Sequence, residues 1–197
     1  STSVSWTPAL ALANQIPSTT SGTCTITCDT YNGSTKIGTK TCTLTLTVPA
    51  SVKPTISSLT ASRVDGNVPS TWGIYVQSKS KATLTINGAA GSYGSTIKSY
   101  SISGGGYSGT SSTLTTGFLN SSGTITFTAT VTDSRGRTSA AATVSITVIA
   151  YSVPFFSSYS SQRCNSGGTI SDDGTYIKAT ISYSFASCSS KNTVTRS

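Results

Sequence analysis

The sequence predicts an all-β protein made of tandem immunoglobulin-like β-sandwich modules with no significant helix, and three observations support this fold class. Hydrophobic residues alternate with Thr and Ser at period two, as in strands with one buried face. Segments of the chain recur about 100 residues apart, which is the length of an immunoglobulin-like sandwich. No stretch has the three-to-four spacing of an amphipathic helix, and no apolar run is long enough to span a membrane as a helix.

The internal repeat sets the expected domain organisation. The stretch TLTLTVPASVKPTISSLTASR (43–63) aligns with TVSITVIAYSVPFFSSYSSQR (143–163), which matches Pro54 with Pro154. Upstream, SGTCTITCDTYNGSTK aligns with SGTITFTATVTDSRGR at an offset of 101 instead of 100, so the two hairpin loops differ by one residue. We predict three segments: 1–53 as the C-terminal part of a module, 54–153 as a complete module, and 154–197 as the N-terminal part of a further module.

Two interpretations of the partial segments stay open at this point. In the first, the chain is a piece of a longer protein. In the second, the two partial modules complete each other, within one molecule or head to tail between molecules, because half a sandwich leaves open edges and an uncovered apolar face. Head-to-tail completion would build a fibre.

Alternation assigns an inner, core-facing side to each predicted strand. In the first segment these residues are Cys24, Ile26, Cys28, Cys42, Leu44, Leu46 and Val48. In the second they are Ile125, Phe127, Ala129, Val131, Val144, Ile146 and Val148, and in the third Ile177, Ala179, Ile181, Tyr183 and Phe185. Between the strands of the second segment, Asp133 is expected to hydrogen-bond its own turn and Gly136 to supply a positive φ.

The five cysteines allow two interpretations. Cys24 and Cys42 are candidates for a disulfide if their hairpin loop has five residues, and Cys164 and Cys188 are a second candidate pair. Alternatively, Cys24, Cys28 and Cys42 are buried, reduced, small apolar side chains, which the apolar residues at the matching positions of the repeat favour. The chain has no C-x-x-C and no His, so we predict no metal site.

The residues available for chemistry argue against catalysis. The chain contains no His and no Glu. Its five acids lie in or beside predicted turns: Asp29, Asp65, Asp133, Asp172 and Asp173. Proton transfer at neutral pH usually relies on His, Lys, Cys or a tuned pair of carboxylates. We therefore predict that the protein is not an enzyme and uses no cofactor.

Charge and loop composition suggest possible partners. The chain has 13 Lys and Arg against 5 acids, a net charge of +8, with only 9% charged residues, which favours loose attraction to polyanions such as teichoic acids or acidic glycans of a host cell wall. Without an aromatic and basic platform, no nucleic acid is expected as partner. Without an apolar run long enough to span a bilayer, no membrane is expected either. The loops GAAGSYGS and SGGGYSGTSS resemble adaptable binding loops. The candidate carbohydrate-binding residues are Trp72, Tyr93, Tyr107 and Arg135.

Several segments resemble minor structural and tail-tip proteins of tailed bacteriophages that infect Gram-positive bacteria. These are YVQSKSKATLTI, YGSTIKSYSI, SGTITFTATVTDSRGRTS and DDGTYIKATISYSF. WTPALALANQIPSTTSGTCTITCDTYNGSTKIG is similar to the module that precedes them in such proteins. The resemblance implies a component of the virion tail, extracellular on release, with immunoglobulin-like modules and often a link to adhesion to the host surface.

Together these expectations favour a non-enzymatic structural protein of a phage virion. It would be a tail or fibre spacer of repeated β-sandwich modules, with end-to-end self-assembly as one version of that role. Its partners would be other virion proteins or copies of itself. The alternatives are a carbohydrate-binding host-adhesion module and a fragment of a secreted bacterial adhesin.

Overall fold

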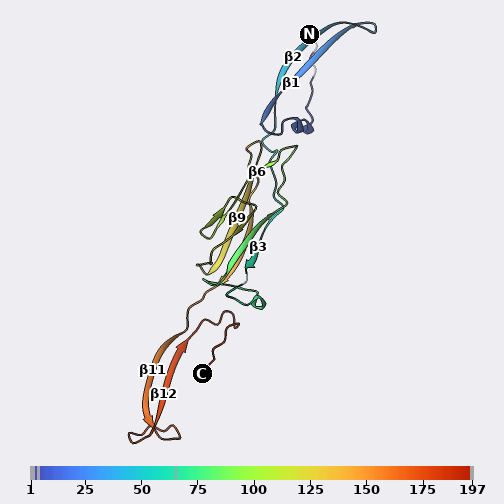
Figure 1. The fold of residues 1–197 in the computed structure, drawn as a ribbon. Coiled ribbons are helices and arrows are strands. Elements are labelled where there is room, and N and C mark those ends of the chain that lie inside the picture. The colour runs from blue at the N-terminus through green and yellow to red at the C-terminus, as the bar shows by residue number, and fades with distance from the viewer. Residues whose placement is uncertain (1–2, 4, 65, 196–197) are drawn as a thin grey trace. The chain divides into compact units, whose positions relative to one another are not determined.

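The computed structural model describes residues 3, 5–64 and 66–195, so Asp65 lies outside the described residues. Within them strands predominate, and the two helices are short 3₁₀ segments, η1 (Leu10–Gln15) and η2 (Ser70–Trp72) (Figure 1). The prediction of an all-β chain without significant helix is confirmed. Neither helix approaches the length that a bilayer-spanning segment needs.

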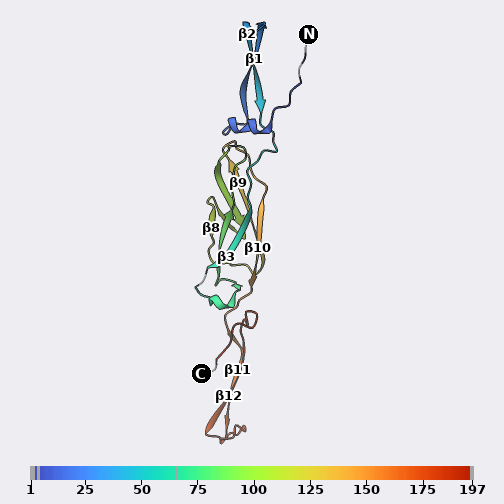
Figure 2. The same cartoon turned by 90° about the vertical axis from the view of Figure 1, so that its right-hand side faces the viewer.

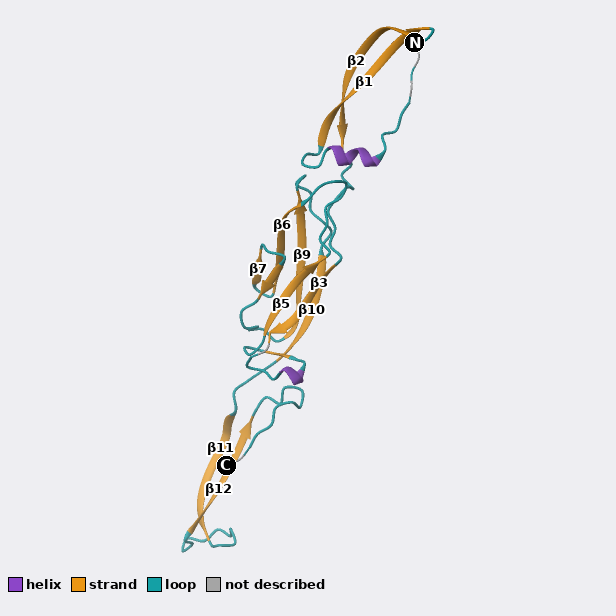
Figure 3. Cartoon of the chain, turned by 45° about the vertical axis from the view of Figure 1, so that its right-hand side comes forward, coloured by secondary structure: helices purple, strands orange, loops and turns teal. Residues whose placement is uncertain are grey.

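Hydrogen bonds join the described strands into four sheets, whose strands are drawn in orange in Figure 3. Two are two-stranded: β1 (Ser21–Asn32) with β2 (Thr35–Thr47), and β11 (Phe155–Cys164) with β12 (Tyr176–Ser184). A three-stranded sheet has the order β3 (Ser58–Val64), β5 (Lys81–Asn87), β8 (Thr113–Thr115). A five-stranded sheet has the order β4 (Tyr75–Val76), β10 (Ala142–Ile149), β9 (Gly123–Asp133), β6 (Ile97–Gly104), β7 (Tyr107–Gly109).

The chain divides into two compact units. The first comprises Ser1–Ser62, Ala82–Thr116 and Thr126–Ser145, and the second Arg63–Lys81, Gly117–Ile125 and Ile146–Ser197. Strands β9 and β10 contribute residues to both units. The three segments expected from the repeat, 1–53, 54–153 and 154–197, stay a prediction.

Period-two alternation produces the core of the β-sandwich formed by the three- and five-stranded sheets. On β5 every second residue is buried, with Leu84 fully inaccessible to solvent. On β9 the same alternation buries Phe127, Ala129 and Val131, again with Phe127 at 0% exposure. The inner face predicted for this segment is confirmed, with Val144 only half-buried. Thr and Ser on the alternate positions solvate the outer faces without charge.

The two sheets approach each other closely at one edge, where β7 and β8 belong to different sheets. Gly109 on β7 lies against Leu114 on β8, and a Cβ added at Gly109 would be 3.1 Å from the Cδ1 atom of Leu114. The missing side chain therefore lets the Leu114 side chain fill this edge of the core.

The β1–β2 hairpin turns through Gly33 and Ser34, with Asn32 opposite Thr35 and a positive φ of 60° at Gly33. At its base, Ala13 of η1 packs with Val48 and Val52 in a small buried cluster, and Figure 2 shows η1 beneath the hairpin. Beyond this cluster, Cys24 and Leu46 of the predicted inner face are half-buried, and the other inner-face residues of the two strands are exposed: Ile26, Cys28, Cys42 and Leu44.

The β11–β12 pair also has an apolar face that is exposed to solvent. Its register places Phe156 opposite Tyr183 and Tyr159 opposite Ile181, so these four side chains share one face. Phe156 is 68% exposed, Tyr159 83% and Ile181 50%. The expected core-facing role of Ile177, Ala179 and Ile181 is not met, because no second sheet among the described residues covers this face and all three side chains are exposed.

A matched pair of substitutions tests this difference in burial. Lys-Ala-Thr recurs at 81–83 and 178–180, so Leu84 and Ile181 hold equivalent strand positions. Leu84→Ala should lower the free energy of unfolding by about 2–5 kcal/mol, because it leaves a cavity in a closed core. Ile181→Ala should change it by about 0.5 kcal/mol or less. Guanidinium denaturation of dilute protein, followed by tryptophan fluorescence, measures both, and equal losses would contradict the assignment.

Candidate functional site

The turn between β9 and β10 is the most highly organised polar site among the described residues. One carboxylate oxygen of Asp133, a fully buried residue, accepts the backbone N–H groups of Arg135 (3.0 Å) and Arg137 (2.9 Å). The N–H of Gly136 donates to the Asp133 carbonyl at 2.9 Å, and Gly136 has a φ of 79°. Both turn roles predicted from the sequence are confirmed. The result is a rigid turn that fixes where its two arginines begin.

Arg135 uses its guanidinium to hold backbone rather than solvent. It is 7% exposed. Its Nε donates to the Ile16 carbonyl at 2.8 Å and its Nη1 to the Ser92 carbonyl at 2.6 Å. Its Nη2 donates to the carbonyls of Ala13, at 2.8 Å, and Tyr93. One side chain thereby connects η1 and its following residue to the loop between β5 and β6.

Arg137 binds the segment that follows β2. Its Nη1 donates to the carbonyls of Pro49 (2.6 Å) and Val52 (2.8 Å), and its Nη2 donates to the Val48 carbonyl. Ser134, in the same turn, donates its hydroxyl to the Pro17 carbonyl at 2.6 Å. We call this set of contacts from residues 133–137 to residues 13–17, 48–52 and 92–93 the arginine clasp. It joins the first hairpin to the turn end of the sandwich within one compact unit.

The chemistry of the arginine clasp is structural. A guanidinium offers five N–H donors in a fixed plane and stays charged at every physiological pH. Backbone carbonyls accept these donors, which makes each bond charge-assisted and stronger than a neutral one. The clasp brings no nucleophile and base together, and the described residues contain no group of three or more His, Cys or acidic side chains able to hold a metal ion.

The structure places the four carbohydrate-binding candidates in different surroundings. Arg135 is buried in the arginine clasp, and Tyr93 contributes its carbonyl there while its side chain stays 40% exposed. Tyr107 begins β7, after a loop in which Gly104, Gly105 and Gly106 all have positive φ. Trp72 is half-buried against Val68 and Val76 in the other compact unit. A sugar could reach the Arg135 guanidinium only by displacing its backbone partners.

All five cysteines are free thiols in the structure. Cys24 lies opposite Leu44 and Cys42 opposite Ile26, because two residues rather than five form the hairpin turn. Diagonal positions on neighbouring strands are too far apart for a disulfide without backbone movement. The expected burial of the thiols in this hairpin is not met, because Cys28 and Cys42 are exposed, whereas Cys164 and Cys188 are both 3% exposed.

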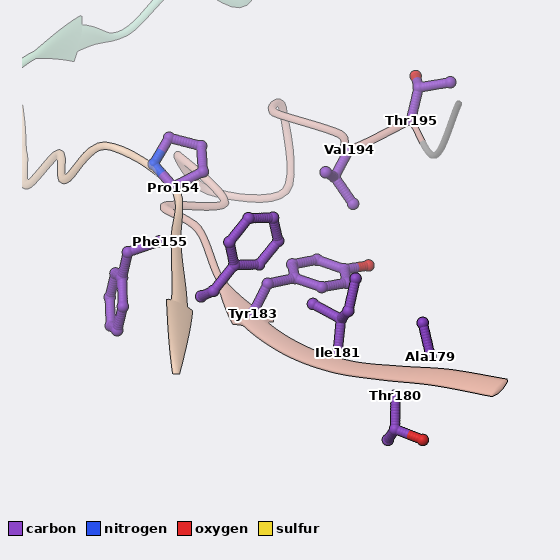
Figure 4. Close-up of a pocket in the computed structure, with 9 residues that line it drawn as sticks. Pro154, Phe155, Ala179, Thr180, Ile181, Tyr183, Val194 and Thr195 are labelled. Atoms are coloured by element: carbon purple, nitrogen blue, oxygen red, sulfur yellow. The ribbon is translucent and has the colours of Figure 1, made fainter. Parts of the chain in front are cut away.

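The second notable surface is an apolar groove on the β11–β12 face. It has a volume of about 690 Å³ and is lined by Pro154, Phe155, Phe156, Ala179, Thr180, Ile181, Tyr183, Val194 and Thr195. Figure 4 shows Ile181, Tyr183 and Val194 directed into the groove, while Thr180 points to the opposite side of β12. The rings of Tyr183 and Phe185 lie 6.3 Å apart, centroid to centroid.

Sequence reasoning missed the partners of Arg137, and it anticipated the uncovered apolar face of a partial module only as part of one of two interpretations. One signal for the first was available: two arginines two residues apart occupy a single turn of a chain that has only 9% charged residues. No local signal predicts the exposure of the β11–β12 face, since alternation identifies the apolar side of a strand but not whether another sheet covers it.

These features define an all-β protein with a sandwich core, two uncovered strand pairs and a hydrogen-bonded joint. The chain belongs to the family described as "Siphovirus protein of unknown function" (DUF859), whose model matches residues 1–195. The phage resemblance is thereby confirmed at the level of a siphovirus protein. No curated protein matches the chain.

Among solved structures, the chain is similar to the fibronectin(III)-like modules of CbhA from Clostridium thermocellum. The match has 16% sequence identity and a TM-score of 0.33, and it covers 62% of this chain and 77% of that one.

Removing Arg137 tests the arginine clasp. Arg137→Ala deletes three charge-assisted hydrogen bonds to the 48–52 segment, at a cost of at least about 1.5 kcal/mol. The amide of Val52, which donates to the Pro49 carbonyl, should then exchange with deuterium roughly tenfold faster. Arg63→Ala is the control, because the Arg63 guanidinium binds the carbonyls of residues 68–70 instead. Unchanged exchange at Val52 would contradict the role of Arg137.

Thiol labelling tests the placement of the cysteines. In native protein, Cys28 and Cys42 should react quickly with a maleimide, while Cys164 and Cys188 should react only after denaturation, because burial shields them. Burial also raises the pKa of the Cys188 thiol and so lowers its thiolate fraction. Mass spectrometry of peptides from protein that has not been reduced reports both accessibility and any disulfide. A Cys24–Cys42 or Cys164–Cys188 bond would overturn this placement.

Proposed function

We propose that the chain is a non-enzymatic structural protein of a siphovirus virion, acting as a spacer in the tail or a fibre. The observation that carries this proposal is the arginine clasp. In it, two arginines of one turn donate hydrogen bonds to seven backbone carbonyls where the first hairpin meets the sandwich. Arg135 donates to four of these carbonyls and Arg137 to three. A joint of this kind fixes the backbone of the first hairpin against the sandwich, which a spacer requires and a catalyst does not.

Composition supports the same role. The chain has few charges, and Thr and Ser on the outer strand faces provide hydration while leaving the chemistry of the surface uniform. Repeating one self-contained unit extends reach without adding new chemistry. Membership in a siphovirus family supports a virion component over a fragment of a secreted bacterial adhesin.

Immunogold labelling of intact particles tests the proposal. Antibodies raised against the 197-residue chain should bind purified virions, with gold confined to the tail, and tryptic peptides of the chain should be present in the same particles. Particles from a phage with the gene deleted are the matched control. Absence of the chain from purified virions, or gold spread over the capsid, would contradict a tail spacer.

A carbohydrate-binding role is the second candidate, and the presentation of Tyr107 favours it. Three consecutive glycines with positive φ hold the turn that precedes Tyr107 in a conformation that other residues rarely adopt. Tyr107 follows that turn directly, and tyrosine is a residue type that binding loops favour. An array of host cell-wall glycans and teichoic acids, probed with wild-type chain and Tyr107→Ala, decides between this role and a pure spacer.

A further inference from the structure

The chain contains two uncovered apolar faces that match the two sides of its own closed core. On the first hairpin, Ile26 is 42% exposed and Leu44 41%. In the alignment of the repeat, Ile26 is equivalent to Phe127, which is 0% exposed within the sandwich. The hairpin therefore carries the core pattern of β9 and β10 without the sheet that covers those strands.

The β11–β12 pair carries the opposite half of the same core. Tyr159 on β11 is equivalent to Leu59 on β3 at an offset of 100, and Ile181 on β12 is equivalent to Leu84 on β5 at an offset of 97. Leu59 and Leu84 are buried, whereas Tyr159 and Ile181 are exposed. The strand pairing agrees, because β3 is hydrogen-bonded to β5 as β11 is to β12.

Within the sandwich, these two halves lie in different sheets that share one core. Strands β3 and β5 belong to the three-stranded sheet, and β9 and β10 to the five-stranded sheet. The chain thus shows which strand pair covers a β3–β5 type face: a β9–β10 type hairpin. The only described strand pair of that type with an open face is β1–β2.

We propose that the β1–β2 hairpin of one copy covers the β11–β12 groove of a second copy, so that the two halves form one sandwich between two chains. The aliphatic row of Ile26 and Leu44 enters the groove lined by Ile181 and Tyr183. The contact is heterologous, with different surfaces on the two partners, so each copy offers both and the assembly continues head to tail. This deepens the spacer role proposed above and rests on it, but its test does not use the virion.

The net charge of the copies opposes this association, so the association should depend on the salt concentration. Each copy carries +8, so copies repel one another in dilute buffer. Raising the salt concentration screens that repulsion and leaves the burial of apolar surface intact. The mass of the assembly should therefore rise with both protein and salt concentration. Association through exposed charge pairs would instead weaken with salt.

Two substitutions on opposite faces give the decisive experiment. Ile26→Asp blocks the hairpin face and leaves the groove intact, whereas Ile181→Asp blocks the groove and leaves the hairpin intact. Because both side chains are already exposed, neither change disturbs the sandwich core, and circular dichroism with thermal unfolding verifies this. The matched controls are Thr27→Asp and Ser182→Asp, which put the same charge on the outer side of the same strands.

Light scattering coupled to size exclusion measures the outcome. We expect wild type and both controls to grow into long assemblies, and each face variant alone to remain monomeric. An equimolar mixture of the two face variants retains one good hairpin and one good groove, so it should stop at a dimer. Wild type that stays monomeric at its highest soluble concentration, or a face variant that still polymerises, overturns the proposal. A chain found in virion tails but monomeric in solution would overturn this proposal alone.

Discussion

The arginine clasp depends on the hydrogen bonds that the Asp133 carboxylate accepts from the backbone of its own turn. The carboxylate accepts hydrogen bonds from two backbone amides of that turn, and so fixes the backbone from which both arginine side chains extend. Its second oxygen, Oδ2, is buried without a hydrogen bond among the described groups, a cost that the turn geometry must offset. Replacing this carboxylate would release Arg135 and Arg137 together, which makes Asp133 more consequential than either arginine.

The same binary pattern is buried in one part of the chain and exposed in two others. Leu84 and Ile181 occupy equivalent positions on strands of the same type, yet one is inaccessible and the other half exposed. Alternation gives a strand one apolar side, but that side is buried only where a second sheet packs over it. Contiguous exposed apolar faces are typical of interaction sites or lead to aggregation, so covering them with a partner surface lowers the free energy.

Sequence reasoning recovered what depends on local chemistry. The alternation on β5 and β9, and the roles of Asp133 and Gly136 in their turn, follow from side chains and backbone preferences within a few residues. It failed where distance in sequence matters. Arg135 binds a carbonyl 119 residues away, and no pattern near Arg135 encodes that contact. The Cys24–Cys42 pairing failed for a different reason: a turn of two residues instead of five, together with a bulge between Thr30 and Tyr31, shifts the cross-strand partners and places Cys24 opposite Leu44.

The repeat preserves the sandwich pattern but not the joint. At the positions equivalent to Arg135 and Arg137, the turn of the first hairpin has Ser34 and Lys36. Lys36 pairs with Asp29 at 2.8 Å, and together with the Thr39 hydroxyl it holds the pKa of Asp29 below its ordinary value. The Lys36 side chain therefore forms an ion pair within its own hairpin, and this turn does not hold a preceding segment as the arginine clasp does. Because a guanidinium recognises backbone carbonyls whatever side chains they carry, the hydrogen bonds of the clasp constrain the backbone of the segments that they hold, whereas the buried cluster of Ala13, Val48 and Val52 constrains the side chains of those segments.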